Sequence, residues 1–554
     1  SPDSVVGDET TCSWLRRVAD RRGAESVWRV WEVGAWIPSP KTRPGGGRLP
    51  LERALAEQNA AVSIPLLEAI SPAGESLTCA VLTQHRDGPY AGSRWGTFAL
   101  AGSGELAPLV AQTVEETAQA LAASIWLQGP RPSFRVHDGH ILLDVDLPVA
   151  NPSPQAATLT VALRIGQNPP ILRDIALPAR QAAAKIERLA EGIPTPVLET
   201  EGLELTIDIR AASGPVFGPR QFVLDLPGQL RAISDFMVAE AADDAKLHGY
   251  SFIDNRGMRA LLGAYEILGD RRYLETALRW GEAMVAEQRE DGGYRMGYGI
   301  TRKGEECYVA DGGEIVVGIL RLASYSTGEQ RERFLASADR YMAYREDFRV
   351  PTGGIGVGWC LQDYGSRPIV PLDTPTRIYA PETNTYTIGC SLAGAYGHAA
   401  IRGGTDLERR AETDADWLMP RAKRLNGAFI ESYFFAHAFA TSAERRKIYA
   451  DYIDQVFLRP TLDTPTTWWL GGGGRHALNL DGLAYCLHRL EAGPETRAEI
   501  YRALCAMYSP QAPHSIPNVI AQSEFDHDRW IYICFGTLGL VDVLKPMVSI
   551  DDWR

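Results

Sequence analysis

The sequence predicts a multidomain β + α protein in which an N-terminal β-sandwich domain is followed by a C-terminal (α/α)6 toroid. Three observations lead to this prediction. Apolar and polar residues alternate with a period of two through residues 130–212, as they do in antiparallel strands with one buried face. Beyond residue 224 the period becomes helical, and apolar helices rich in Gly and Ala recur six times, roughly 50–70 residues apart. Most of them are followed by a charged, amphipathic helix, which indicates an inner and an outer helical layer.

We expect residues 1–128 to form a mixed α/β region. The periodicity predicts a short helix at Thr11–Asp20 and a longer amphipathic helix at Leu106–Leu127. Between them, the apolar runs Ala61–Glu68 and Leu77–Thr83 predict two strands.

The second region, residues 129–215, is expected to be an antiparallel β-sandwich, because Pro, Asn and Gly turns separate its alternating runs. These runs are Ser133–Val136, His140–Leu147, Ala157–Ile165 and Leu203–Arg210. The Gly- and Pro-containing segment Ala211–Pro219 is expected to link this region to the helices.

Residues 216–554 are expected to form the toroid. After a first helix at Leu224–Leu247, the predicted hairpins pair Phe252–Leu268 with Arg271–Arg289, Glu314–Tyr325 with Gln330–Phe348, Thr385–Arg402 with Leu407–Arg424, Phe429–Ala440 with Ala443–Leu458 and Leu478–Leu490 with Glu495–Tyr508, and the last inner helix is Arg529–Leu544. An open superhelix would show more even repeats and polar caps at both ends. Long loops rich in Gly and aromatic residues precede several inner helices, and they favour a closed ring around a mouth.

The stretch Tyr308–Tyr325 organises this region. Tyr308, Asp311 and Glu314 are expected in a Gly-rich turn that leads directly into an apolar helix with few charges on any face. Such a helix is buried all round, so polar residues at its start face a cavity. If all inner helices run in one direction, the residues at their starts converge on one funnel.

A β region followed by such a ring of helix pairs resembles the superfamily of (α/α)6 carbohydrate-active enzymes, which includes glycoside hydrolases and polysaccharide lyases. The resemblance covers residues 225–554 and, more loosely, the β region before them. It is architectural, because no single family's catalytic motif is intact, and no family role transfers to an individual residue. It implies a carbohydrate substrate.

Several carboxylates at one mouth suit glycoside hydrolysis, in which one carboxylic acid protonates the leaving oxygen and a second carboxylate activates water or attacks the sugar. The candidate catalytic residues are Asp311, Glu314, Glu382 and Glu431. The candidate substrate-binding residues are Tyr250, Asp254, Arg256, Tyr308, Trp359, Asn384, Tyr386, Tyr433, Trp468, Trp469, His476, His527 and Arg529. The competing interpretations are helix capping for the carboxylates and core packing for the aromatic residues.

Two alternative functions remain open from the sequence. A polysaccharide lyase would use a Tyr or His to take a proton from a uronate, with an Arg or Asn neutralising the uronate carboxylate. Tyr386, Tyr433 and His476 are the candidates for the base, and Asn384 is a candidate for the neutralising group. A non-catalytic carbohydrate-binding protein on the same ring is the further alternative.

Composition limits the remaining classes. The net charge is −13, which gives nucleic-acid binding no electrostatic support, and no apolar run is long enough to span a bilayer. The eight cysteines include no CxxC pair, so we expect neither a disulfide framework nor a zinc site. His514 with Asp526, His527 and Asp528 has the spacing of no standard metal site, and we expect no metal and no cofactor.

The chain begins at Ser1 rather than Met, so we expect an upstream segment to have been removed or left out. No targeting segment is visible in the sequence, and localisation, secreted or cytoplasmic, stays open, as does the oligomeric state.

Overall fold

The computed structural model describes, besides single residues between 111 and 121 and at 198, residues 14–18, 31–36, 61–70, 76–85, 94–98, 125–127, 131–151, 155–179, 185–195, 202–211, 214–241, 251–296, 305–363, 370–379, 385–422, 427–464, 479–509, 515–520 and 527–546. The chain divides into two compact units. The first comprises residues 1–226, 466–473 and 501–525, and the second comprises residues 227–465, 474–500 and 526–554.

The first unit begins with a five-stranded antiparallel sheet of order β2-β1-β3-β4-β5. Its strands are β1 (Trp14–Val18), β2 (Trp31–Trp36), β3 (Ala61–Ile70), β4 (Ser76–His85) and β5 (Arg94–Phe98). The structure confirms the two strands predicted between residues 61 and 83. The predicted helix at Thr11–Asp20 is wrong, because β1 pairs with β2 on one side and β3 on the other. Inter-strand bonds on both sides override a weak helical pattern this short.

The predicted helix at Leu106–Leu127 is only partly correct. The described residues between 111 and 121 are helical, but Trp126–Leu127 form the strand β6. This strand pairs with Val149 and Ala150 of β8 (His140–Ala150). The helix therefore ends earlier than its periodicity suggested, because the sheet supplies partners for the backbone at Trp126 and Leu127.

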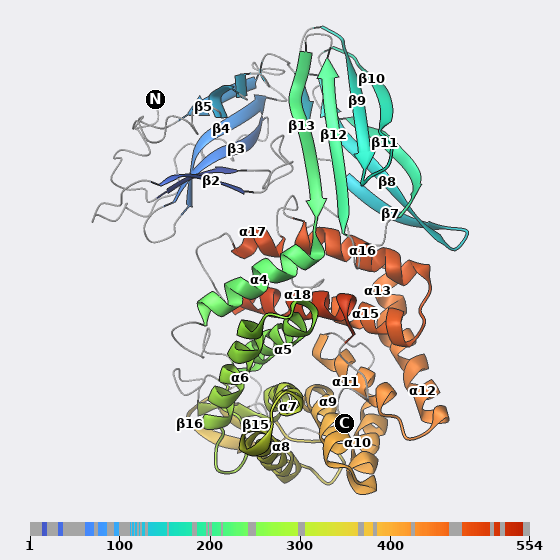
Figure 1. Ribbon diagram of the computed structural model, residues 1–554. Helices are drawn as coiled ribbons and strands as arrows, with labels where there is room; N and C mark the ends of the chain where they lie inside the picture. The colour runs from blue at the N-terminus through green and yellow to red at the C-terminus, as the bar shows by residue number, and fades with distance from the viewer. Residues whose placement is uncertain are drawn as a thin grey trace. The chain divides into compact units, whose positions relative to one another are not determined.

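Two four-stranded antiparallel sheets follow (Figure 1). In one, β8 lies between β11 (Lys185–Pro194) and β6 and also pairs with β7 (Arg131–His137). The other has the order β10-β9-β12-β13, with β9 at Ala157–Ile165, β10 at Ile171–Leu177, β12 at Leu203–Ala211 and β13 at Gly214–Leu224. Alternate residues of β9 and β12 are buried, as a period of two requires when one face is covered. The four predicted alternating runs are confirmed as β7, β8, β9 and β12.

The predicted linker at Ala211–Pro219 is wrong. Strand β13 (Gly214–Leu224) occupies most of it and pairs with β12 along its length. Pro215 and Pro219 are tolerated because β13 lies at the edge of its sheet, where not every residue needs a backbone N–H for a partner strand.

The second unit is mainly helical, and the predicted helices are confirmed to within a few residues at most ends; the helix predicted at Glu495–Tyr508 continues into the first unit, which contains residues 501–525. They are α4 (Leu226–Glu240), α5 (Ser251–Leu268), α6 (Arg271–Ala286), α7 (Val309–Ser324), α8 (Gly328–Asp347), α9 (Tyr386–Arg402), α10 (Thr405–Leu418), α11 (Gly427–Ala438), α12 (Ala443–Ile453), α15 (Leu480–Arg489), α16 (Pro494–Tyr508) and α18 (His527–Leu544). A π-helical segment, Asp454–Leu458, and the short α13 (Arg459–Leu462) continue α12. The chain also forms a short helix, α17 (Ile516–Ile520).

The apolar helices pack on one another in a cyclic order. Neighbouring contacts run from α5 through α7, α9, α11, α15 and α18, and α18 in turn packs against α5. The charged helices α6, α8, α10 and α12 each pack on the apolar helix that precedes them. Residues 309–323 of α7 are all buried, whereas α8 buries only one side. The predicted division into a buried inner helix and a partly exposed outer helix is therefore confirmed for α7 and α8, whereas α16, predicted as an outer helix, is mostly buried.

The Gly-rich turn predicted before α7 is wrong, because Asp311, Gly312, Gly313 and Glu314 already belong to the helix. The two glycines serve close packing instead. A Cβ atom on Gly312 would lie 2.4 Å from the Tyr341 ring, and one on Gly313 would lie 2.3 Å from the Ser391 Cα in α9. These positions let α7 approach its neighbours to a distance that any side chain would prevent.

We expect Gly313→Ala to lower the free energy of unfolding by about 1–3 kcal/mol or more, because overpacking against backbone atoms cannot be relieved by a rotamer change. The measurement is urea denaturation followed by circular dichroism. Gly493→Ala is the matched control, because the atom nearest to its added Cβ is the flexible end of Glu495. Equal stability of the two variants would contradict the packing role of Gly313.

The second unit also contains a small sheet directly before α7. The strands β14 (Cys307–Tyr308), β15 (Gly358–Asp363) and β16 (Val370–Ile378) form a small antiparallel sheet that the sequence analysis did not predict. It fixes the chain just before α7.

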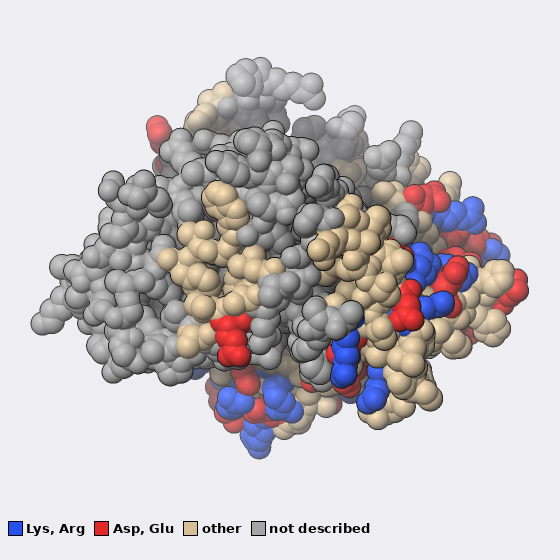
Figure 2. Space-filling view, turned by 90° about the horizontal axis from the view of Figure 1, so that it is seen from above, with Lys and Arg blue, Asp and Glu red and all other residues tan. Residues whose placement is uncertain are grey.

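Among the described helices, none has the length and apolar character needed to cross a bilayer. On the face shown in Figure 2, the described acidic and basic residues are interspersed.

Candidate active site at the amino ends of the inner helices

A cluster of charged side chains lies where the amino-terminal parts of four inner helices meet. Arg256 and Arg259 come from α5, Glu314 from α7, Glu431 from α11 and Asp481 from α15. Each lies within the first three turns of its helix. Four of the six inner helices therefore bring residues from their amino-terminal parts together.

Arg256 is the centre of this cluster. Its Nη2 atom lies 2.5 Å from Glu314 Oε2 and 2.9 Å from Glu431 Oε2, and its Nη1 atom lies 3.7 Å from Asp481 Oδ2. The guanidinium also lies over the Phe535 ring of α18, 4.7 Å from its centre. Arg259 donates a hydrogen bond to Glu431 through Nη2. One cation thus holds three carboxyl groups, and a second cation binds only one of them.

The carboxyl groups of Glu314 and Glu431 differ in their electrostatics although they share Arg256. Burial raises the pKa of Glu314 to about 7, and the charge of Glu431 adds to this rise while Arg256 opposes it. For Glu431, burial is outweighed by Arg256 and Arg259, which lower its pKa below the usual value. Burial likewise raises the pKa of Asp481 to about 6. Glu314 can therefore carry a proton near neutral pH while Glu431 stays ionised.

The cluster is incompletely hydrogen-bonded among the residues that the structure describes. Arg256 Nε and Arg259 Nη1 are buried without a hydrogen-bond partner there, whereas Glu314 Oε2 and Glu431 Oε2 contact Arg256 Nη2 only as ion pairs. Buried polar atoms without partners are rare and concentrate at functional sites or at bound water. This arrangement differs from a saturated structural ion pair.

Asp311 and Tyr386 lie closer to solvent beside this cluster. Asp311 precedes Glu314 by three residues in α7, so the two carboxylates share one face of the helix. Asp311 is 9% exposed and Glu314 is 5% exposed. Tyr386, the first residue of α9, is 54% exposed. Its pKa lies well above the usual range because of the neighbouring Cys390 thiol, burial and the charges of Asp311 and Glu314.

Three other predicted site residues have clear structural partners. Tyr308 donates a hydrogen bond from its hydroxyl group to Glu306 Oε1 at 2.7 Å, just before α7. Asp254 is buried and accepts a hydrogen bond at 2.7 Å from Trp530 Nε1 in α18. Arg256 is only 1% exposed. We therefore no longer count Asp254 and Arg256 as substrate ligands, since both are engaged within the protein.

Tyr433 and Trp359 do not have the free faces that sugar stacking requires. Tyr433 is fully buried, and its hydroxyl group donates to the Ala415 carbonyl oxygen at 3.1 Å. The Trp359 indole N–H donates to Asp291, and the Arg289 guanidinium lies over its ring at 4.7 Å. We withdraw both as substrate-binding candidates, because core packing and cation–π contacts occupy them.

The other candidates lie outside the described residues or have side chains that the structure does not describe. They are Glu382, Tyr250, Asn384, Trp468, Trp469, His476, His527 and Arg529, and the same holds for the metal candidates His514, Asp526 and Asp528. Sequence reasoning missed Arg259 and Asp481. Asp481 lies in the first turn of α15, so the rule that selected polar residues at the starts of inner helices would have found it. Arg259 lies in the third turn of α5, and its signal is its position about one turn after Arg256 on the same face of the helix.

No protein-family model matches the chain, and no curated protein sequence matches it. Among solved structures, a metagenome-derived glycoside hydrolase family 9 endoglucanase is 13% identical, covers 65% of this chain and 79% of its own, and has a TM-score of 0.40. A cellobiose 2-epimerase from Bacillus thermoamylovorans is 10% identical over 50% of this chain and 85% of its own, with a TM-score of 0.36. A β-1,2-glucanase from Parabacteroides distasonis is 9% identical over 76% and 73%, with a TM-score of 0.30.

These three structural matches are enzymes that act on carbohydrates. At such low identities and TM-scores, the superpositions carry no argument about the activity or the catalytic residues of this chain. That argument rests on its own side chains.

Proposed function

We propose that this chain is a carbohydrate-active enzyme, with an N-terminal β-sandwich and an (α/α)6 toroid, and that it hydrolyses glycosidic bonds. The observation that carries the proposal is the pair of carboxyl groups with opposite pKa shifts, Glu314 and Glu431, where the inner helices meet. Glycoside hydrolysis requires a carboxylic acid that is protonated near neutral pH, and the ionised Glu431 helps to keep Glu314 in that state; a further carboxylate must act on water or on the sugar.

In the proposed mechanism, Glu314 is the general acid and protonates the oxygen of the leaving sugar. Asp311, on the same face of α7 and nearer to solvent, activates water or attacks the sugar as the second carboxylate. Glu431 is held by two guanidinium groups, so it acts as a positioning residue. Its negative charge keeps the pKa of Glu314 high, and Arg256 fixes the orientation of both carboxyl groups.

Lyase chemistry has weaker support from the same geometry. A tyrosine that takes a proton from a uronate works best when its pKa is lowered, whereas the pKa of Tyr386 is raised. Tyr433 lies in the core, with its hydroxyl group bound to a backbone oxygen. Arg256 is already paired with carboxylates, so it is not available to neutralise a uronate.

The test is incubation of the full chain with neutral and uronate-bearing glycans, following reducing ends and the ultraviolet absorbance of unsaturated uronates together. We expect new reducing ends without absorbance. We also expect the rate to fall as the pH rises through about 7, because the general acid must be protonated and the pKa of Glu314 is about 7. Rising absorbance would replace the proposal with the lyase, and binding without turnover would replace it with a carbohydrate-binding protein.

A further inference from the structure

We propose that the second unit carries a separate binding site for a small hydroxy acid of the size of one sugar ring, in a cavity between α8, α9 and α10. We call it the outer cavity. Its volume is about 210 Å³. Ala395 and His398 line it from the second half of α9. Ala395 lies nine residues after Tyr386, about 14 Å along the helix at 1.5 Å per residue, so the outer cavity is distinct from the candidate active site.

One wall of the outer cavity is an ion-pair cluster that is already complete. The Arg345 guanidinium donates to Ser391 Oγ at 3.0 Å, to Glu346 Oε1 at 2.9 Å and to Asp414 Oδ2 at 2.6 Å. Arg349 binds both of these carboxylates as well. Two cations and two anions therefore balance, and Arg345 and Glu346 give the cavity shape but no net charge.

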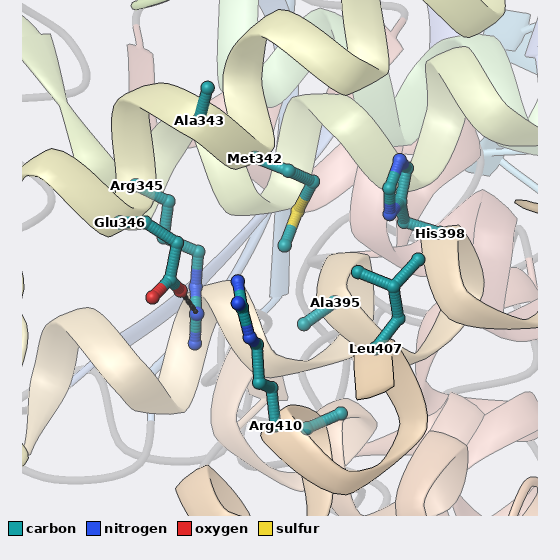
Figure 3. A pocket seen from close by; sticks show the side chains of 9 residues that line it. Met342, Ala343, Arg345, Glu346, Ala395, His398, Leu407 and Arg410 are labelled. Carbon is teal, nitrogen blue, oxygen red and sulfur yellow. Dashed lines mark hydrogen bonds and ion pairs between the residues drawn. The ribbon is translucent and has the colours of Figure 1, made fainter. Parts of the chain in front are cut away.

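Arg410 gives the outer cavity a net positive charge. Its side chain reaches from α10 toward Met342 and Arg345 (Figure 3). Within the described part of the chain, its guanidinium has no hydrogen-bond or ion-pair partner, whereas the adjacent Arg409 pairs with Asp406. A guanidinium with two free parallel N–H groups at a partly enclosed cavity fits a carboxylate.

His398 supplies a second polar contact. It is 6% exposed, and its Nε2 atom lies 2.7 Å from Asp339 Oδ1. Burial raises the pKa of Asp339, but hydrogen bonds from Arg402 and His398 outweigh it and hold this pKa below the usual value. Asp339 is therefore an acceptor, so His398 carries its proton on Nε2 when neutral. Its buried Nδ1 has no partner among the described residues, and it is left to accept a hydrogen bond from a ligand hydroxyl group.

The remaining walls limit the size of the ligand and favour a ligand with an apolar face. They are apolar and come from Met342, Ala343, Ala395, Leu407 and Ala411. At about 30 Å³ for each water molecule of the liquid, the cavity holds roughly seven waters, or one sugar ring. A carboxylate for Arg410, a hydroxyl group for His398 and an apolar face for these walls together describe a hydroxy acid such as a sugar acid.

The experiment is isothermal titration of the full chain with sodium D-glucuronate, with D-glucose as the neutral probe. We expect glucuronate to bind at least about tenfold more tightly than glucose, because the charge-assisted bonds to Arg410 need a carboxylate. Arg410→Met and Met342→Trp, which fills the cavity, should each weaken glucuronate binding by at least about tenfold. Arg409→Met is the matched control and should bind as the unmodified protein does.

One further variant distinguishes ligand binding in the outer cavity from ligand binding at the candidate active site. Glu314→Gln should leave glucuronate binding unchanged. A chain that hydrolyses no glycan could therefore still show glucuronate binding in the outer cavity, and the two proposals are tested separately. The proposal is wrong if glucuronate gives no heat of binding, if glucose binds equally well, or if Arg410→Met and Met342→Trp bind as Arg409→Met does. Loss of binding in Glu314→Gln alone would assign the ligand to the inner-helix cluster instead.

Discussion

Replacing Glu314 by Gln is expected to reduce kcat on the glycan substrate by about 10²–10⁴-fold, the usual contribution of a general acid. The amide has nearly the shape of the carboxyl group but has no acidic proton to transfer to the leaving oxygen. The fall in rate above pH 7 should disappear in the residual activity, because that fall reports the ionisation of Glu314, whose pKa is about 7. The measurement is a pH–rate profile of both proteins.

Glu329→Gln is the matched control for this substitution. Glu329 lies in the first turn of the outer helix α8, and its side chain is exposed, so the variant should keep the parental kcat and pH profile. Normal activity of Glu314→Gln, in a protein that unfolds at the parental urea concentration, would refute the assignment of Glu314 as the acid. The search would then move to Asp311 by Asn substitution.

The helical unit could be predicted closely because its signal is long and repeated. The inner helices are 10–18 residues long and mostly apolar, so errors at the ends do not change their identity. Shorter segments hold too few residues for their period to identify a helix or a strand. Trp14–Val18 was predicted as helix because a handful of residues fits either period, and only its pairing with β2 and β3 decides between them.

The glycines of α7 show a different limit. Gly312 and Gly313 are equally consistent with a turn and with a close contact between helices. The deciding atoms belong to Tyr341 and Ser391, which lie far along the chain, and local sequence carries no information about such partners.

The sequence placed the candidate residues near the starts of the inner helices but did not show which way their side chains point around the helix axis. Residues two apart on a helix point about 200° apart around its axis, at 3.6 residues per turn. Glu431 and Tyr433 therefore cannot both face the cluster, and Tyr433 packs in the core. The same spacing separates Arg256 from Asp254, which points to Trp530. Helical periodicity alone could have excluded one member of each pair, whereas the ion pairs themselves depend on which helices meet.

Arg256→Met is expected to lower the free energy of unfolding of the helical unit by about 3–5 kcal/mol, because it leaves buried carboxylates without their cation. The unmodified chain contains two units, so the variant is compared by the midpoint of the helical transition in urea. Arg333→Met is the matched control. It breaks an exposed pair with Glu282, at 2.7 Å, and such surface pairs are worth about 0–1 kcal/mol.

A double variant separates the buried charge from the lost side-chain volume. Arg256→Met combined with Glu314→Gln should be more stable than Arg256→Met alone, since Glu314, the carboxylate that pairs with Arg256 only, is left unpaired by the first change and is neutralised by the second, whereas Glu431 keeps Arg259. A cavity effect alone would make the two changes additive and the double variant less stable. That outcome, or equal stability of Arg256→Met and Arg333→Met, would show that Arg256 does not hold the carboxyl groups of the inner helices together, and the electrostatic basis for Glu314 as the acid would fall with it.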